Sequence, residues 1–190
     1  METKDVKDDI VRKTFTPNDY VTFWKTSCIR DDFTSQYFML GMTEEASEVL
    51  EEIRKKESFT IDVLKECGDV LWYLTGMILR NGLNPDATFG IGWTETRQSE
   101  ADEKNKLTAA LDLVQAVGVL AGRLKKYERG DFGKDQLRAY VTKHAKIVSD
   151  CLSIVCETHG GNLALVARQN KEKITRRLEA KTIRGDGSSR

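Results

Sequence analysis

Apolar residues recur every three or four positions along most of this chain, which is the spacing of helices that bury one face. A first helix is predicted to begin with Thr16 as its N-cap and Pro17 in its first turn. The pattern predicts further helices at about 34–56, 61–81, 107–127, 134–157 and 163–178. From 70 to 79 the chain is apolar nearly all round, so this part of its helix should be buried on most sides. Together these segments predict an all-α protein, a helical bundle.

Two stretches fall outside this pattern. The segment 89–106 is rich in glycine, threonine and charge, which predicts a long exposed connection. The segment 183–190 has no core residues and is predicted to be a flexible tail. A chain of 190 residues is most simply one domain, here 1–190, and is long enough to bury a real core. Within it we expect an acid-bearing half at about 15–84 and a second helical half at about 105–180.

The two halves resemble each other, which suggests an internal duplication. A shift of seventy residues places Ala46 on Ala116 and Leu50 on Leu120. A shift of seventy-eight residues aligns the helix predicted at 61–81 with the one predicted at 134–157. The acids are not repeated, since Glu45, Glu48, Glu66 and Asp69 correspond to Gln115, Gly118, His144 and Ile147. We therefore predict two fused helical-hairpin repeats, of which only the first retains an acidic site. The alternative is that any two amphipathic helical hairpins would align this well.

Composition narrows the class of protein. The 30 basic and 30 acidic residues cancel, so no overall field attracts nucleic acid or a membrane. Four cysteines without Cys-x-x-Cys spacing and only two histidines argue against a zinc site or a disulfide framework. The start of the chain is too charged for a signal peptide, and no apolar run approaches the roughly 18 residues of a membrane span. We expect a cytoplasmic protein that binds neither a nucleic acid polymer nor a membrane.

Two acidic pairs carry the chemistry. Glu45 and Glu48 are three residues apart, as are Glu66 and Asp69. On a helix this spacing puts both side chains of a pair on one face, with Cβ atoms roughly 5–6 Å apart. Four carboxylates from two adjacent helices suit a hard cation such as Mg²⁺ or Mn²⁺, and a site of this kind usually handles phosphate. A di-iron site of the ferritin type would need Glu-x-x-His pairs, which neither histidine provides.

The simpler interpretation of the first pair is a solvated helix face, since glutamates crowd 44–52. The second pair is harder to explain in this way. Glu66 and Asp69 come just before the most apolar run of the chain, where an unpaired carboxylate would be costly to bury. Gly68 lies between them and lowers helix propensity, which suggests close approach of a neighbouring helix.

The acidic segments resemble a known family. Residues 40–48 read Leu-Gly-Met-Thr-Glu-Glu-Ala-Ser-Glu and residues 64–73 read Leu-Lys-Glu-Cys-Gly-Asp-Val-Leu-Trp-Tyr. This is similar to the Glu-Glu-x-x-Glu, gap, Glu-x-x-Asp pattern of the MazG-like, all-α nucleoside triphosphate pyrophosphohydrolases. The ending at 160–190 also resembles the family. The stretch between the acidic segments and this ending is extra relative to the shortest members of the family. It is similar to related dimeric dUTPase-like enzymes, in which helical repeats are fused in one chain.

The resemblance implies a site and a reaction. By position, the metal ligands would be Glu45, Glu48, Glu66 and Asp69, the candidate general bases Glu44 and Glu48, and the substrate-binding residues Lys55, Asn170, Lys173 and Arg177. The cofactor would be Mg²⁺, with Mn²⁺ as a substitute. The reaction would cleave a (d)NTP between its α- and β-phosphates to give (d)NMP and pyrophosphate, as housecleaning of the nucleotide pool, in a homo-oligomer that we expect to be a dimer.

Some interpretations stay open. For Lys55 and Arg177, a solvated helix face is the simpler explanation. Trp24, Tyr37 or Trp72 could stack on the nucleotide base, but a core position is the more ordinary role of such aromatic rings. The alternative to an enzyme is a catalytically weak helical module that senses nucleotides or binds a protein partner.

Overall fold

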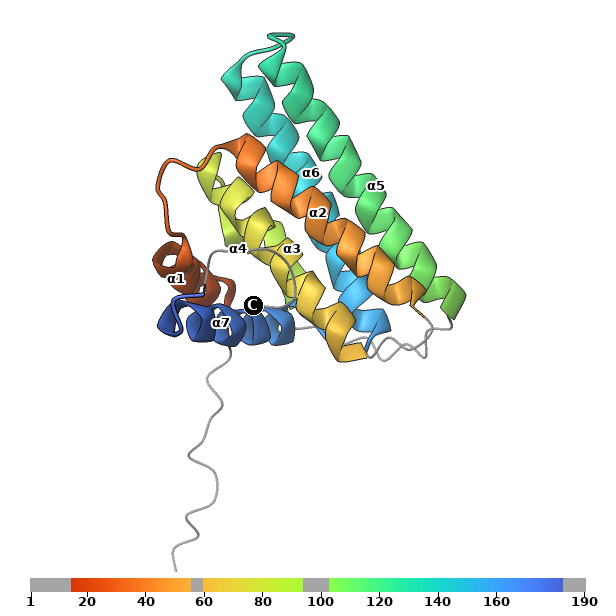
Figure 1. The fold of residues 1–190 in the computed structure, drawn as a ribbon. Helices are drawn as coiled ribbons and strands as arrows, with labels where there is room; N and C mark the ends of the chain where they lie inside the picture. Colours follow the sequence, from red (N-terminus) through yellow and green to blue (C-terminus); the bar gives the residue numbers. More distant parts are fainter. Residues whose placement is uncertain (1–14, 56–59, 94–102, 183–190) are drawn as a thin grey trace, which may run out of the picture.

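The computed structural model describes residues 15–55, 60–93 and 103–182, and this part of the chain is helical and contains no strand (Figure 1). Its elements are α1 (Pro17–Ser27), α2 (Ser35–Arg54), α3 (Thr60–Arg80), α4 (Pro85–Phe89), the 3₁₀ helix η1 (Gly90–Trp93), α5 (Glu103–Glu128), α6 (Lys134–Thr158) and α7 (Leu163–Glu179). The prediction of an all-α helical bundle is therefore confirmed.

The helix ends follow local rules that the sequence contains. Thr16 caps α1 in a capping box with Asp19, and the side chain of Asn162 caps α7 by accepting from the Leu165 amide at 2.8 Å. Gly82 follows α3 with a φ of +65°, the left-handed conformation expected of it there.

Two boundaries differ from the prediction. The structure adds α4 just before the predicted irregular connection of 89–106 and η1 at its beginning, and α5 begins at Glu103 rather than near 107. Short helices carry too little periodicity to be seen in a sequence, and α4 depends on a cap by Asn84. The rest of the expected connection, 94–102, lies outside the described residues, as does the tail 183–190.

Four long helices form the body of the molecule. α2 pairs with α3 and α5 pairs with α6, and the two hairpins then pack together through α2 on α5 and α3 on α6 (Figure 1). α1 and α7 pack against each other and against α3. Two helical hairpins are thus present as predicted, while their common ancestry stays a prediction.

One hydrophobic core runs through all the long helices. Its centre is α3, in which Leu71, Leu74, Met77 and Ile78 are fully buried, as the apolar run predicted. Two glycines allow α2 and α3 to pack closely, because a Cβ atom on Gly41 or Gly76 would collide with an aromatic ring of the facing helix. The α2–α3 hairpin is therefore a tightly fixed platform for the side chains at its surface.

Helix α5 corrects one expectation. Its segment Asn105–Glu128 is long and apolar enough to cross a membrane by length and composition, although no such segment was expected from the sequence. This is weak evidence for a membrane, because core helices of soluble proteins have the same properties. Here α5 packs on α2 and α6 with one face and leaves Leu111 about half exposed on another.

Candidate functional site

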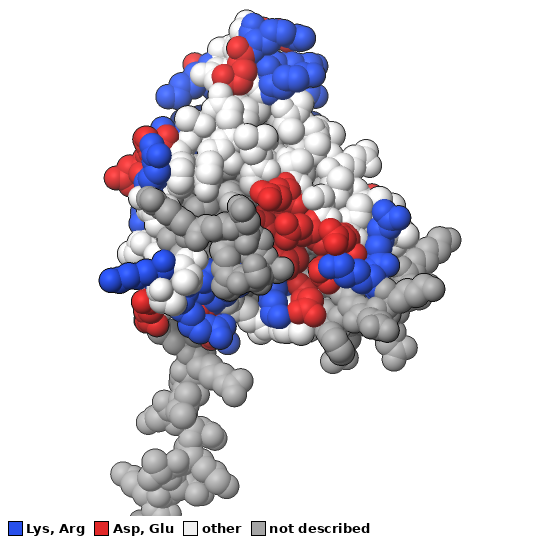
Figure 2. Space-filling view, viewed as in Figure 1, with Lys and Arg blue, Asp and Glu red and all other residues white. Residues whose placement is uncertain are grey.

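Three of the predicted metal ligands converge on the surface of the α2–α3 hairpin. Each of Glu45, Glu48 and Glu66 offers one carboxylate oxygen, and these three oxygens all lie within 4.8 Å of one another. Glu45 and Glu66 are partly buried, whereas Glu48 is exposed. Figure 2 shows acidic side chains gathered in a patch on the face of the molecule that carries these helices. We call Glu45, Glu48 and Glu66 the carboxylate triad.

The triad is electrostatically crowded. Burial, together with the negative charges of Asp69, Glu48 and Glu66, raises the pKa of Glu45 to about 8. Burial and the charge of Asp69 raise the pKa of Glu66 to about 7. Burial and the charges of Glu44 and Asp69 also raise the pKa of Glu48. A cation placed among these oxygens would relieve both the repulsion and the cost of burial.

Asp69, the fourth predicted ligand, lies next to the triad but is engaged by α7. Its Oδ1 accepts a hydrogen bond from Nδ2 of Asn170 at 2.8 Å, and its Oδ2 forms an ion pair with Nζ of Lys173. Both side chains of the Asp69–Lys173 pair are largely buried. The structure therefore brings Asn170 and Lys173 to the acidic site, where both engage Asp69.

Close approach of α7 to α3 depends on Gly68. A Cβ atom at this position would lie 3.0 Å from Cβ of Asn170, which is tighter than an ordinary contact. The expectation that Gly68 admits a neighbouring helix therefore agrees with the structure. The helix it admits is the one that supplies the partners of Asp69.

Tyr20 is a residue of this site that the sequence did not reveal. Its side chain is fully buried, and its hydroxyl donates to Oδ1 of Asn170 at 2.8 Å. The sequence indicated only that Tyr20 belongs to the apolar face of the first helix. A signal that could have found it is the hydroxyl itself, since a buried tyrosine hydroxyl usually has a hydrogen-bond partner.

The remaining predicted residues divide into two groups. Glu44 is exposed one helical turn before Glu48, and Arg177 follows Lys173 by one turn on α7, so both lie on faces that include the site. Lys55 instead forms ion pairs with Glu51 at 3.3 Å and with Glu52 near the end of α2. The simpler interpretation of Lys55, a solvated helix face, fits this geometry.

The aromatic candidates also separate. The indole N–H of Trp24 donates to the carbonyl of Trp72, and that of Trp72 donates to Oγ of Ser27, so both rings are tied into the core. Tyr37 is 37% exposed, and its ring lies 5.9 Å from that of Tyr73. Burial raises the pKa of Tyr73, with further contributions from the nearby Tyr37 and Glu45. Tyr73 therefore lies near Glu45, and the ring of Tyr37 packs against that of Tyr73.

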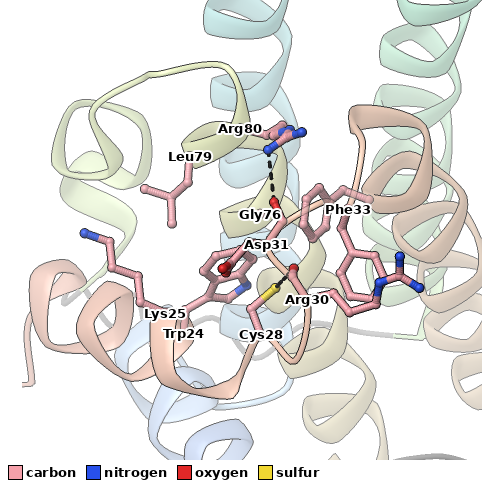
Figure 3. Close-up of a pocket in the computed structure, with 10 residues that line it drawn as sticks. Trp24, Lys25, Cys28, Arg30, Asp31, Phe33, Gly76, Leu79 and Arg80 are labelled. Carbon is pink, nitrogen blue, oxygen red and sulfur yellow. Dashed lines mark hydrogen bonds between the residues drawn. The ribbon is translucent and has the colours of Figure 1, made fainter.

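A separate pocket of about 250 Å³ lies where the end of α1 meets the end of α3 (Figure 3). Its lining includes Trp24, one of the candidates for stacking on the base, but none of the predicted metal ligands, general bases or substrate-binding residues. Two of its cations have partners, since Arg30 forms an ion pair with Asp32 and Arg80 donates to the carbonyl of Asp31. The carboxylate chemistry therefore resides in the triad, not in this pocket.

Comparison with known proteins agrees with this location. The family model of the MazG nucleotide pyrophosphohydrolase domain matches residues 33–81, which span α2 and α3. No curated protein and no solved structure matched the chain. The predicted resemblance to the MazG-like family is thereby confirmed over the helical hairpin that holds Glu45, Glu48, Glu66 and Asp69.

Proposed function

We propose that this protein is a Mg²⁺-dependent nucleoside triphosphate pyrophosphohydrolase, which converts a (d)NTP into (d)NMP and pyrophosphate in nucleotide-pool housecleaning. The observation that carries this proposal is the carboxylate triad of Glu45, Glu48 and Glu66, whose oxygens lie within 4.8 Å of one another in the segment that matches the MazG family. A nucleotide pyrophosphohydrolase needs a group of this kind to hold a cation against the phosphates.

The chemistry of the donor set fits Mg²⁺. All the donors are carboxylate oxygens, which hard divalent cations prefer, and Mn²⁺ accepts the same ligands. Burial, followed by the negative charge of Asp69, raises the pKa of Glu45 to about 8 and that of Glu66 to about 7, so ionisation of these carboxyl groups is costly without a cation. Metal binding would compete with protons for these carboxylates, so its affinity should rise with pH.

The residues of the chain have distinct roles in the proposed reaction. Bound Mg²⁺ would neutralise the triphosphate and lower the pKa of a water molecule. The carboxylates of Glu45, Glu48 and Glu66 would hold the Mg²⁺ ion, with Asp69 beside them. Glu44 or Glu48 would accept the proton of the water that attacks the α-phosphorus, after which pyrophosphate leaves.

The basic side chains of α7 complete the arrangement. Lys173 lies beside the triad, where its charge lowers the pKa of Glu45 and Glu66, and Arg177 follows one turn later. We propose that these two side chains offer positive charge to the phosphates. Asn170 would hold Asp69 in place through the hydrogen bond to Oδ1.

The decisive experiment measures pyrophosphate and nucleoside monophosphate after incubation of the full chain with Mg²⁺ and a panel of NTPs and dNTPs that includes dUTP. Glu48→Gln and Asp69→Asn should each abolish release, whereas Glu128→Gln, at the exposed end of α5, should not change it. Absence of release by the folded wild-type protein would overturn the proposal. Binding of Mg-nucleotide without turnover would support the alternative, a nucleotide-sensing module.

We further propose that the protein is a homodimer that acts in the cytoplasm on free nucleotides. Exposed apolar side chains support self-association, among them Leu111 on α5 and Ile154 on α6, which are 50% and 49% exposed. All four cysteines are free, which suits a reducing compartment. Light scattering coupled to size-exclusion chromatography should give a mass near twice the 21.5 kDa of the chain.

A further inference from the structure

A buried hydrogen-bond chain connects the core of the protein to the acidic site. The hydroxyl of Tyr20, on α1, donates to Oδ1 of Asn170, on α7, and Nδ2 of Asn170 donates to Oδ1 of Asp69, on α3. Both bonds are 2.8 Å long, and they join positions that are 150 and 101 residues apart in the sequence. Tyr20 is fully buried and Asn170 is 3% exposed, so water does not readily replace either bond.

The two ends of this chain fix the orientation of the Asn170 amide. An ionised Asp69 carboxylate only accepts hydrogen bonds, so it requires the NH₂ group of Asn170. The carbonyl oxygen of the amide then points the other way, towards Tyr20, whose hydroxyl supplies the donor that this buried oxygen needs. A flipped amide would place its oxygen against the carboxylate of Asp69 and its NH₂ group against a hydroxyl that must then accept. Tyr20 and Asp69 therefore favour the same orientation.

Asn170 is also held sterically. Its Cβ packs closely on Gly68, the residue just before Asp69, and would lie only 3.0 Å from a Cβ atom placed on the glycine. The second oxygen of Asp69 is paired with Lys173, three residues after Asn170 on the same helix. The direction of the Asp69 carboxylate is thus determined by side chains of α7. The hydroxyl of Tyr20 in turn orients the Asn170 amide, which holds one oxygen of Asp69.

We propose that Tyr20 is a positioning residue for the metal site, which acts through Asn170 to aim the Asp69 carboxylate at the cation held by Glu45, Glu48 and Glu66. The inference rests on the proposed function, because it assumes that the triad holds a cation. Groups that orient metal ligands in this way usually change metal affinity about 10- to 100-fold when they are removed. Tyr20 would therefore matter to the site although it lies inside the core and is not itself a ligand.

The test is the affinity of the full chain for Mn²⁺ alone, measured by electron paramagnetic resonance, which needs no catalysis. Tyr20→Phe keeps the ring and removes the hydroxyl, and should raise the dissociation constant about tenfold. Tyr140→Phe is the matched control, because this hydroxyl belongs to an exposed contact with Gln136 on α6. Affinities for Tyr20→Phe and the wild type within a factor of two would overturn the proposal.

A double-mutant cycle separates positioning from general loosening of the core. Asn170→Ala alone should weaken Mn²⁺ binding at least as much as Tyr20→Phe, and adding Tyr20→Phe to it should cause no further loss, since the hydroxyl acts through the amide. Additive losses would overturn the proposed route. If Tyr20→Phe fails to fold, the Asn170→Ala variant tests the proposal. Unchanged Mn²⁺ affinity of that variant would exclude a positioning role for the hydrogen bonds from Tyr20 through Asn170 to Asp69.

The outcomes distinguish this inference from the proposed function. Mn²⁺ binding that depends on Tyr20 in a protein that hydrolyses no nucleotide would overturn the proposed reaction and retain the positioning role. Hydrolysis and Mn²⁺ affinity that are both unaffected by Tyr20→Phe would retain the reaction and overturn the positioning role. A wild-type protein that binds no Mn²⁺ would overturn both.

Discussion

Replacing Glu45 by glutamine should stabilise the protein without metal at high pH. The ordinary pKa of a glutamate side chain is 4.5, whereas Glu45 has a pKa of about 8 in the folded protein, chiefly because of burial. The folded state therefore binds the proton more tightly than the unfolded chain does, and ionisation of Glu45 favours unfolding. Its unfavourable contribution is absent below pH 4.5, grows as the pH rises, and is complete above pH 8.

The size of the effect follows from the two pKa values. The difference between 4.5 and about 8 corresponds to about 5 kcal/mol at 1.36 kcal/mol per pKa unit, which is an upper limit. Glu45 is partly exposed, so solvent screening reduces this value, and we expect Glu45→Gln to raise the free energy of unfolding by about 1–3 kcal/mol at pH 9. At pH 5 the folded carboxyl is protonated and resembles glutamine, so the two proteins should differ little.

Urea unfolding with a chelator present measures the difference in the free energy of unfolding between Glu45→Gln and the wild type, at pH 5 and at pH 9. The same titration with Mg²⁺ should cancel or reverse the stability advantage of Glu45→Gln, because a cation that binds only the folded wild type at 100 times its dissociation constant adds about 2.7 kcal/mol. Glu128→Gln, at the exposed end of α5, is the control. The electrostatic reasoning is refuted if Glu45→Gln is no more stable than the wild type at pH 9, or if Mg²⁺ stabilises both proteins equally.

Two further predictions concern α7. Gly68→Ala should destabilise the protein by about 1–3 kcal/mol in thermal unfolding and weaken Mn²⁺ binding, because the added methyl group forces Asn170 away. Gly118→Ala is the matched control, because nothing lies within 4 Å of a Cβ atom at that position. It should stabilise the protein by roughly 0.5–1 kcal/mol. Equal effects of Gly68→Ala and Gly118→Ala would contradict the packing argument. Lys173→Met should shift Mg²⁺ binding, followed by calorimetry against pH, towards higher pH, because the lysine charge lowers the pKa of Glu45. An unchanged pH dependence would show that Lys173 does not act on the triad.

The sequence alone predicted the helices and the faces that carry acids, because both depend on local spacing. Caps such as Thr16 and Asn162 mark where helices begin, and residues three apart share a face whatever the rest of the chain does. Glu45 with Glu48, and Glu66 with Asp69, could therefore be paired without a structure. The MazG resemblance followed from the same local pattern.

Local spacing also misled in places. The helices α4 and η1 are too short to show a period, and the composition of α5 does not reveal that it packs on α2 and α6. The family resemblance makes Lys55 a candidate for substrate binding, but the sequence does not show which acids lie beside its charge. In the structure its nearest acids, Glu51 and Glu52, engage it.

Only the tertiary structure decided how the acids are used. It joined Glu45, Glu48 and Glu66 into a triad and assigned Asp69 to Asn170 and Lys173. These contacts join α3 to a helix about one hundred residues later, and the bond from Tyr20 spans 150 residues. A sequence shows which groups need partners, but the choice among distant partners depends on how α1, α3 and α7 pack, because a hydrogen bond forms only where packing brings donor and acceptor within about 3 Å.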